Sequence, residues 1–289
     1  WIAVAAVAGR ITLGQMTMYL MLFRQGQAAV SASLTAIGGM YEDNLYLSTL
    51  YEYLETPVPE LRPGLPKGPD PDDGIRFVPV FDDGGSYSIG CVTLDPNNPH
   101  VVWVGTGENN SQRSVSFGDG VYKSLDGGST WTNMGLKDSE HIGNIVVDPR
   151  DSNRVFVAAQ GPLWSAGGER GVYMTTDGGA TWEQVLGGGE YTGANEVVMH
   201  PTNPDILFAV LHQRFRDVAA LMNGGPESGI HKSVDGGRTW RVLKNGLPKE
   251  DMGKIGLAIS PQRPEVLYAA IELGGRQGGA WRSTDGGES

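Results

Sequence analysis

The chain has 289 residues, 43 of them glycine, and a formal net charge of −11. Clustered Lys and Arg, which a nucleic-acid surface needs, do not occur, and the glycines lack the three-residue period of collagen. Seven Trp, ten Tyr and seven Phe exclude wholesale disorder. Because 38 glycines lie in residues 63–289, the sequence predicts two unlike pieces, the second of turn-rich β-structure.

The first piece is predicted to be helical over residues 1–55. Residues 1–41 contain no Asp, Glu or Lys, and two apolar stretches flank a Gly-containing break at residues 9–14. A bilayer core needs about 20 apolar residues in a helix, and neither stretch alone is a strong spanning segment. We expect one or two α-helices of membrane type, with membrane contact through residues 1–40. The alternative is a soluble amphipathic helix with a linker.

Residues 1–77 resemble the end of an ABC exporter transmembrane domain and its linker. The resemblance lies in the order of the segments. The end of an apolar helix is followed by a short turn, a long moderately polar helix, and a Pro-rich linker with a strand remnant at residues 56–77. No Gly-x-x-x-x-Gly-Lys-Ser/Thr phosphate loop occurs in the sequence, so we expect no ATPase site. The resemblance ends near Phe77, and we interpret the join there as an assembly or gene-fusion artefact.

Two interleaved repeats fill residues 78–289. In one, a Pro turn such as residues 94–99 precedes a β-rich run. The other reads Ser/Thr-x-Asp-Gly-Gly-x-Thr-Trp at residues 124–131, 175–182 and 233–240, and it recurs at residues 283–289 without the aromatic residue. Its aspartates are 51, 58 and 50 residues apart. A period near 50 with short strands is typical of a propeller-like array of four-stranded units.

The second repeat is the Asp-box, or BNR repeat, and residues 78–289 resemble sortilin-like bacterial β-propellers. The resemblance implies a mainly β fold of about four four-stranded blades, truncated at its C-terminus and extracytoplasmic in its parent family. Asp can accept hydrogen bonds within its own turn, and Trp can pack against neighbouring strands. The residues expected to have this structural role are Asp126, Trp131, Asp177, Trp182, Asp235, Trp240 and Asp285.

Antiparallel topology predicts that the Pro turns and Asp-boxes share one end of each blade, and that the longer loops share the other end. These loops mix acids, Arg and amides, as binding loops do. The candidate ligand-binding residues are Glu108, Asn109, Arg113, Glu169, Arg170, Arg214 and Arg216. Weak catalytic candidates are Glu108, Asp217 and Glu227, because a glycosidase needs two carboxyl groups.

Three functions remain open on sequence grounds. The favoured one is a non-catalytic propeller module that binds a protein or a glycan. The first alternative is a glycoside hydrolase propeller, and the second is the transmembrane component of an ABC transporter with an accessory propeller. The histidines form no metal-binding motif, so we expect neither a metal nor a cofactor, and the net charge argues against nucleic acid as a partner.

Overall fold

The computed structural model describes residues 79–82 and 88–289. The chain divides into a unit of residues 1–76 and a unit of residues 77–289. The helices and linker predicted for residues 1–77 lie outside the described residues. Within the part of the chain that the structure describes, no helix is long and apolar enough to cross a membrane.

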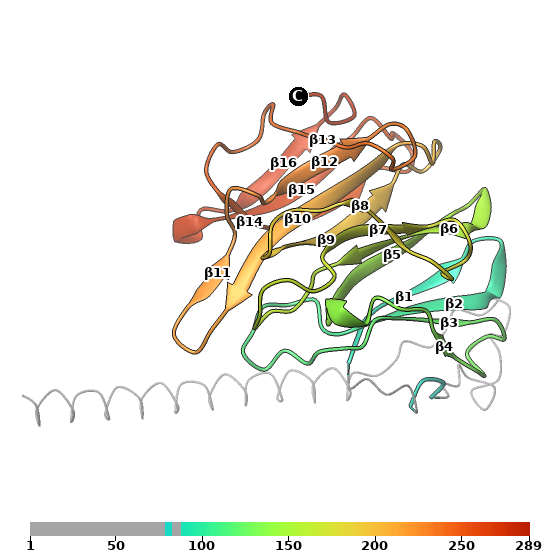
Figure 1. Ribbon diagram of the computed structural model, residues 1–289. Helices are drawn as coiled ribbons and strands as arrows, with labels where there is room; N and C mark the ends of the chain where they lie inside the picture. Colours follow the sequence, from blue (N-terminus) through green and yellow to red (C-terminus); the bar gives the residue numbers. More distant parts are fainter. Residues whose placement is uncertain (1–78, 83–87) are drawn as a thin grey trace, which may run out of the picture. The chain divides into compact units, whose positions relative to one another are not determined.

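The described residues form four antiparallel sheets that follow one another along the chain (Figure 1). Blade 1 contains β1 (Ile89–Asp95), β2 (Asn98–Thr106), β3 (Val121–Ser124) and β4 (Thr132–Asn133). Blade 2 contains β5 (Ile142–Asp148), β6 (Asp151–Ala159), β7 (Gly171–Thr175) and β8 (Glu183–Leu186). Blade 3 contains β9 (Thr192–Met199), β10 (Leu207–Arg216), β11 (Leu221–Asn223), β12 (Gly229–Ser233) and β13 (Arg241–Val242). Blade 4 contains β14 (Met252–Ile259), β15 (Leu267–Leu273) and β16 (Gly279–Ser283). Short 3₁₀ turns also lie between β4 and β5, at Lys137–Ser139, and between β15 and β16, at Gly274–Arg276.

The prediction of a mainly β fold with repeated antiparallel sheets is confirmed, but the expected four strands occur only in blades 1 and 2. Blade 3 has five strands because β10 continues through Arg216, where the sequence analysis expected a loop, and pairs there with β11. Blade 4 has three strands among the described residues. Glu272 lies in β15.

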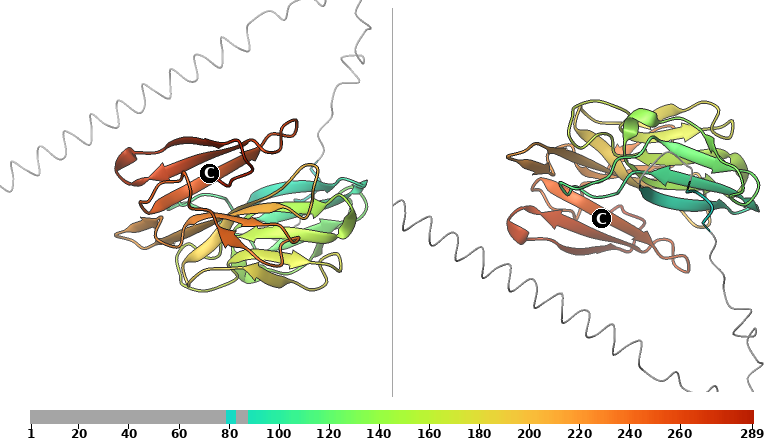
Figure 2. Two further views of the ribbon diagram at one scale, coloured as in Figure 1. Left: turned by 90° about the horizontal axis from the view of Figure 1, so that it is seen from above. Right: turned by 90° about the horizontal axis from the view of Figure 1, so that it is seen from below.

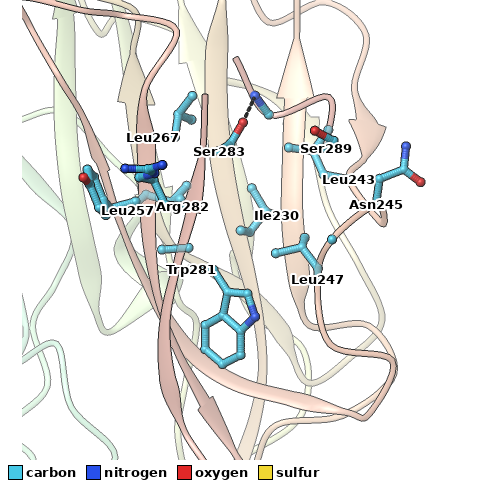
Figure 3. A pocket seen from close by; sticks show the side chains of 14 residues that line it. Ile230, Leu243, Asn245, Leu247, Leu257, Leu267, Trp281, Arg282, Ser283 and Ser289 are labelled. Atoms are coloured by element: carbon cyan, nitrogen blue, oxygen red, sulfur yellow. Dashed lines mark hydrogen bonds between the residues drawn. The ribbon is translucent and has the colours of Figure 1, made fainter. Parts of the chain in front are cut away.

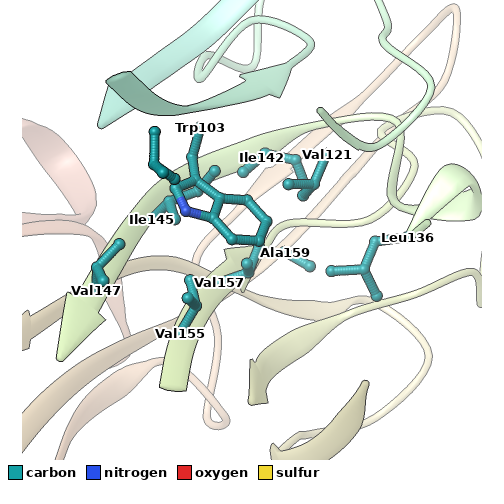
Figure 4. Close-up of a cluster of buried hydrophobic side chains, with 10 residues drawn as sticks. Trp103, Val121, Leu136, Ile142, Ile145, Val147, Val155, Val157 and Ala159 are labelled. Carbon is teal, nitrogen blue, oxygen red and sulfur yellow. The ribbon is translucent and has the colours of Figure 1, made fainter. Parts of the chain in front are cut away.

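The blades stack face to face and bury their apolar residues between them (Figure 2). The first strands of successive blades are neighbours, since β5 contacts β1 and β9, and β14 contacts β9. Trp103 and Val121 of blade 1 meet Val155 and Val157 of blade 2, and all four side chains are fully buried (Figure 4). Alternation along each strand thus supplies the core on both faces of the inner blades.

The Asp-boxes of blades 1, 2 and 3 close the turns β3–β4, β7–β8 and β12–β13, and that of blade 4 follows β16. In blade 2, the Asp177 carboxylate accepts hydrogen bonds from Thr175 Oγ1 at 2.6 Å and from Thr181 N and Oγ1 at 2.9 and 2.6 Å. Gly178 and Gly179 have positive φ values of 73° and 98°. Glycine adopts such angles at little cost, so the two glycines let the chain reverse around the aspartate.

The same turns join one blade to the next. A Cβ added to Gly179 of blade 2 would lie 2.9 Å from Trp103 of blade 1, so the two residues are in close contact. Lys123 of blade 1 places its Nζ 4.6 Å from the centroid of the Trp103 ring and donates to the Gly178 carbonyl at 2.9 Å. Blades 3 and 4 repeat the arrangement, where Lys232 lies 5.4 Å from the Phe208 ring and donates to the Gly286 carbonyl at 2.6 Å.

Candidate functional site

The Pro turns and the Asp-boxes lie at one end of the blades. Gly127 N donates to the His100 carbonyl at 2.8 Å, and Gly178 N donates to the Asn153 carbonyl at 3.0 Å, so the two turns of a blade touch. The connections between the second and third strands therefore lie at the opposite end. We call this end the loop face.

Residues 109–113 of blade 1 form a strap across the loop face. Lys254 of blade 4 donates from Nζ to the Asn109 carbonyl at 2.7 Å and to Asn109 Oδ1 at 2.8 Å. Gln160 of blade 2 donates from Nε2 to the same Oδ1 at 2.6 Å. One asparagine of blade 1 is thus bonded to two other blades.

Blade 3 holds the rest of the strap with two arginines. Arg214 donates from Nη1 to the Asn110 carbonyl at 2.8 Å, and Arg216 donates from Nη1 to the Ser111 carbonyl at 2.6 Å. Arg113 of the strap reaches back and donates from Nη2 to the Val218 carbonyl at 3.0 Å. The strap follows an irregular path, and these cations satisfy carbonyl groups that no strand ladder can reach.

A groove with a volume of about 520 Å³ runs beside the strap, between it and blades 3 and 4. It is lined by Asn110, Ser111, Gln112, Arg113, Arg216, Leu221, Asn223, Lys254 and Glu272. Glu272 accepts hydrogen bonds from Asn223 Nδ2 at 2.9 Å and from Lys254 N at 3.3 Å. The groove presents guanidinium, ammonium, amide, hydroxyl and carboxylate groups together, and we treat it as the candidate site.

Of the candidate ligand-binding residues, Arg113 and Arg216 line this groove, whereas Arg170 and Arg214 are buried with 4 % and 1 % exposure. Arg170 donates to the carbonyls of Gln160 at 2.9 Å and Ser165 at 2.9 Å, among others. Burial, together with the charge of the neighbouring Arg170, lowers the pKa of Arg214 to about 9. These two arginines support the loops and do not line their surface.

Most of the acidic candidates cap loop backbones. Glu108 accepts from Asn110 Nδ2 at 3.0 Å, and Glu169 accepts from Asp138 N at 2.9 Å. Asp217 accepts from Ala219 N and Ala220 N at 2.7 and 2.6 Å, and Glu227 accepts from Gly189 N at 2.9 Å. None of these four acids is among the residues that line the groove.

Two histidines lie buried behind the groove. Burial lowers the pKa of His141 and of His212 to about 3, and the charge of Arg214 contributes to both shifts. Both rings are therefore neutral near pH 7. Within residues 79–82 and 88–289, no group of three His, Cys, Asp or Glu side chains is arranged to hold a metal ion.

A second cavity is apolar and lies between blades 3 and 4 (Figure 3). Its volume is about 100 Å³, and Ile230, Leu243, Leu247 and Trp281 are among its lining residues. Gly246 also lines the cavity. It comes shortly after β13, the last strand of blade 3, just as Gly135 comes shortly after β4, the last strand of blade 1. The indole of Trp182, from the Asp-box of blade 2, packs beside Gly135 of blade 1. The cavity beside Gly246 therefore lies at the equivalent place between two blades, and few of its lining groups are polar.

Sequence reasoning missed Lys254 and Asn223 as groove residues. Lys254 lies near the start of β14, the first strand of blade 4, and antiparallel topology places that end of the strand at the loop face. This signal was present in the sequence. Asn223 was hidden because it lies in β11, which extends the β10 hairpin beyond the repeat pattern.

The fold and the site define a blade-repeat β protein with Asp-box turns at one end and a polar groove at the other. A family model described as "Sortilin, neurotensin receptor 3" (Sortilin-Vps10) matches residues 119–252, which is less than half of the chain. A sortilin-like propeller is thus supported for this part of the sequence.

Two curated relatives are glycan-degrading enzymes by name. A probable oligoxyloglucan-reducing end-specific xyloglucanase of Neosartorya fischeri is 30 % identical over 101 residues, which cover 33 % of this chain and 10 % of that protein. A xyloglucanase of Hypocrea jecorina is 25 % identical over 220 residues, covering 68 % of this chain and 24 % of that protein. The chain therefore spans about a quarter or less of the relatives' length.

Among solved structures, an ancestral GH74 enzyme is similar in fold, with a TM-score of 0.52 at 21 % identity. The alignment covers 70 % of this chain and 24 % of that enzyme. At this identity the likeness concerns the fold, and the activity of the larger enzyme is considered only as a proposal below.

Proposed function

We propose that the blade-repeat part of the chain is a non-catalytic module that binds a glycan in the loop-face groove. The observation that carries the proposal is the groove itself, which gathers side chains of blades 1, 3 and 4 around about 520 Å³ of open space. Amide groups such as those of Gln112 and Asn223 both donate and accept hydrogen bonds, as sugar hydroxyls do. The names of the xyloglucanase relatives support the same ligand class.

The proposal is tested by measuring the binding of xyloglucan oligosaccharides and a panel of other glycans by calorimetry. Replacing Asn223 by Ala or Gln112 by Ala should weaken binding about fivefold, because one net hydrogen bond contributes about 1 kcal/mol. Gln262→Ala is the matched control, since Gln262 is exposed in the Pro turn at the opposite end. If no glycan of the panel binds and a peptide binds in the groove, the ligand is a protein and the glycan proposal is wrong.

The second candidate function is glycoside hydrolysis, which the names of the relatives favour. Retaining and inverting glycosidases generally use two carboxyl groups, and Glu272 is the carboxylate among the groove-lining residues of the described chain. A reducing-sugar assay with xyloglucan decides the matter. Turnover by the parent chain that disappears in Glu272→Gln would establish hydrolysis and replace the binding proposal.

For residues 1–55 we propose the exporter-like membrane helices, and for the blades an extracytoplasmic location, on the sequence resemblance stated above. Cell fractionation and protease accessibility test both. Recovery of the full chain in the soluble fraction would overturn the membrane proposal. Digestion of the blades only after cell lysis would overturn the extracytoplasmic one.

A further inference from the structure

Cations outnumber acids in the groove lining. Arg113, Arg216 and Lys254 line it, against the single carboxylate of Glu272. Among the described residues, none of these three cations has a carboxylate oxygen within 4.0 Å. They donate to the neutral oxygens of Val218, Ser111 and Asn109, as described above. The groove wall therefore carries positive charge that no ion pair within this part of the chain neutralises.

More positive charge lies directly behind the strap. The guanidinium groups of Arg214 and Arg170 are buried and also donate to carbonyl oxygens. Removing an ionised group from water is costly unless an opposite charge compensates it. Glu140 lies near both arginines, and Glu196 and Glu272 lie near Lys254, but none of these three acids has a carboxylate oxygen within 4.0 Å of the cations' side-chain nitrogen atoms. The fold thus retains a cationic centre at the loop face.

The groove cations keep free hydrogen-bond donors. Arg216 uses Nη1 for the Ser111 carbonyl, and its Nε is shielded from solvent, so it meets a ligand in the groove through its Nη atoms. Arg113 is exposed and uses one Nη for the Val218 carbonyl. Guanidinium groups bind carboxylates through paired N–H donors. The chain as a whole carries a net charge of −11, so the positive charge of this site is opposite in sign to that of the chain.

We propose that the groove selects a glycan that carries carboxylate groups, such as a uronic acid oligomer, over a neutral glycan of the same backbone. This inference rests on the proposed glycan-binding function and narrows it to a ligand class. The groove cations Arg113 and Arg216 would hold the carboxylate, and the amides of Gln112 and Asn223 would hold the hydroxyl groups.

The test compares oligogalacturonates with their fully methyl-esterified forms, which share the backbone but lack the charge. Calorimetry on the full chain at low ionic strength should give at least a tenfold lower Kd for the acid form. Because salt screens charges at exposed sites, the difference should shrink as NaCl rises to about 0.5 M. Equal affinity for both forms would overturn this inference and leave glycan binding standing, whereas no binding of either form or of any other glycan would overturn both.

Charge variants at exposed strap positions locate the effect. Arg113→Gln should raise the Kd for the acid form several-fold more than the Kd for the ester. Both Gln112→Lys and Gln112→Glu lose the amide, so the charge effect is read as a ratio: Gln112→Lys should increase the preference for the acid form over the ester, and Gln112→Glu should decrease it. Arg263→Gln removes a cation that is 72 % exposed at the opposite end, and it serves as the control for net charge. Equal effects of Arg113→Gln and Arg263→Gln would contradict selection by the groove.

Discussion

At the residue scale, the Asp-box aspartate is the position whose chemistry the structure defines most closely. Asp177 lies in a turn where Thr175 and Thr181 donate to its carboxylate. We expect Asp177→Asn to lower the Tm, because an amide nitrogen cannot accept these bonds and the turn loses charge-assisted contacts. Thermal unfolding measured by circular dichroism checks this. Asp251→Asn, at an exposed aspartate of the same chain, is the control and should leave the Tm unchanged.

The same chemistry predicts an acid dependence. Hydrogen bonds from Thr130 and Ser124 lower the pKa of Asp126 to about 2, below its ordinary value of 3.8. A carboxyl group whose pKa is depressed by folding stabilises the fold above its unfolded-state pKa. The stabilising contribution of Asp126 is therefore complete above about pH 4 and is lost as the pH falls towards 2. Urea unfolding from pH 5 to 2 should show a smaller loss of stability in Asp126→Asn than in the parent chain.

At the element scale, the close contact between one blade's Asp-box and the next blade's aromatic strand is the recurring unit of assembly. Gly179→Ala would place a methyl group 2.9 Å from the Trp103 ring at a φ of 98°. We expect a loss of about 2–4 kcal/mol, from the left-handed backbone and from overpacking. Gly167→Ala has a similar φ of 74° but meets nothing within 4 Å, so it reports the backbone cost alone. Urea unfolding compares them, and equal losses would mean that the blades do not depend on this contact.

The repeat pattern predicted the elements better than the site. A Pro turn was expected at residues 94–99 before a β-rich run, and the structure has this turn between β1, which ends at Asp95, and β2, which runs from Asn98 to Thr106. Apolar alternation and turn residues encode such local features. The burial of Arg214 depends instead on a strap about a hundred residues away in sequence. Charged residues of irregular loops have no periodicity, so sequence could name the arginines but not separate the supporting ones from those that line the groove.

At the scale of the whole described unit, the strap is what connects the first blade to the fourth, because Lys254 bonds Asn109 across 145 residues of sequence. A double-mutant cycle of Asn109→Ala and Lys254→Met should give a coupling energy of about 1–2 kcal/mol, since a hydrogen bond to a charged group contributes more than a neutral one. The exposed pair Arg263 and Glu265, 72 % and 47 % exposed, is the matched comparison. Its coupling should be about 0.5 kcal/mol or less.

The two cycles also separate a local contact from a connection between blades. If the strap joins blades 1 and 4, both Asn109→Ala and Lys254→Met should increase hydrogen exchange in residues 107–118 and at the first residues of β14. Each segment then loses the partner that limits its opening. The surface-pair variants should change exchange only around residues 263–265. The opposite result has two parts: the coupling energy of Asn109 and Lys254 is no larger than that of the surface pair, and hydrogen exchange changes in blade 4 alone. This result would show that blade 1 is held by its neighbour blade 2 and not by the strap.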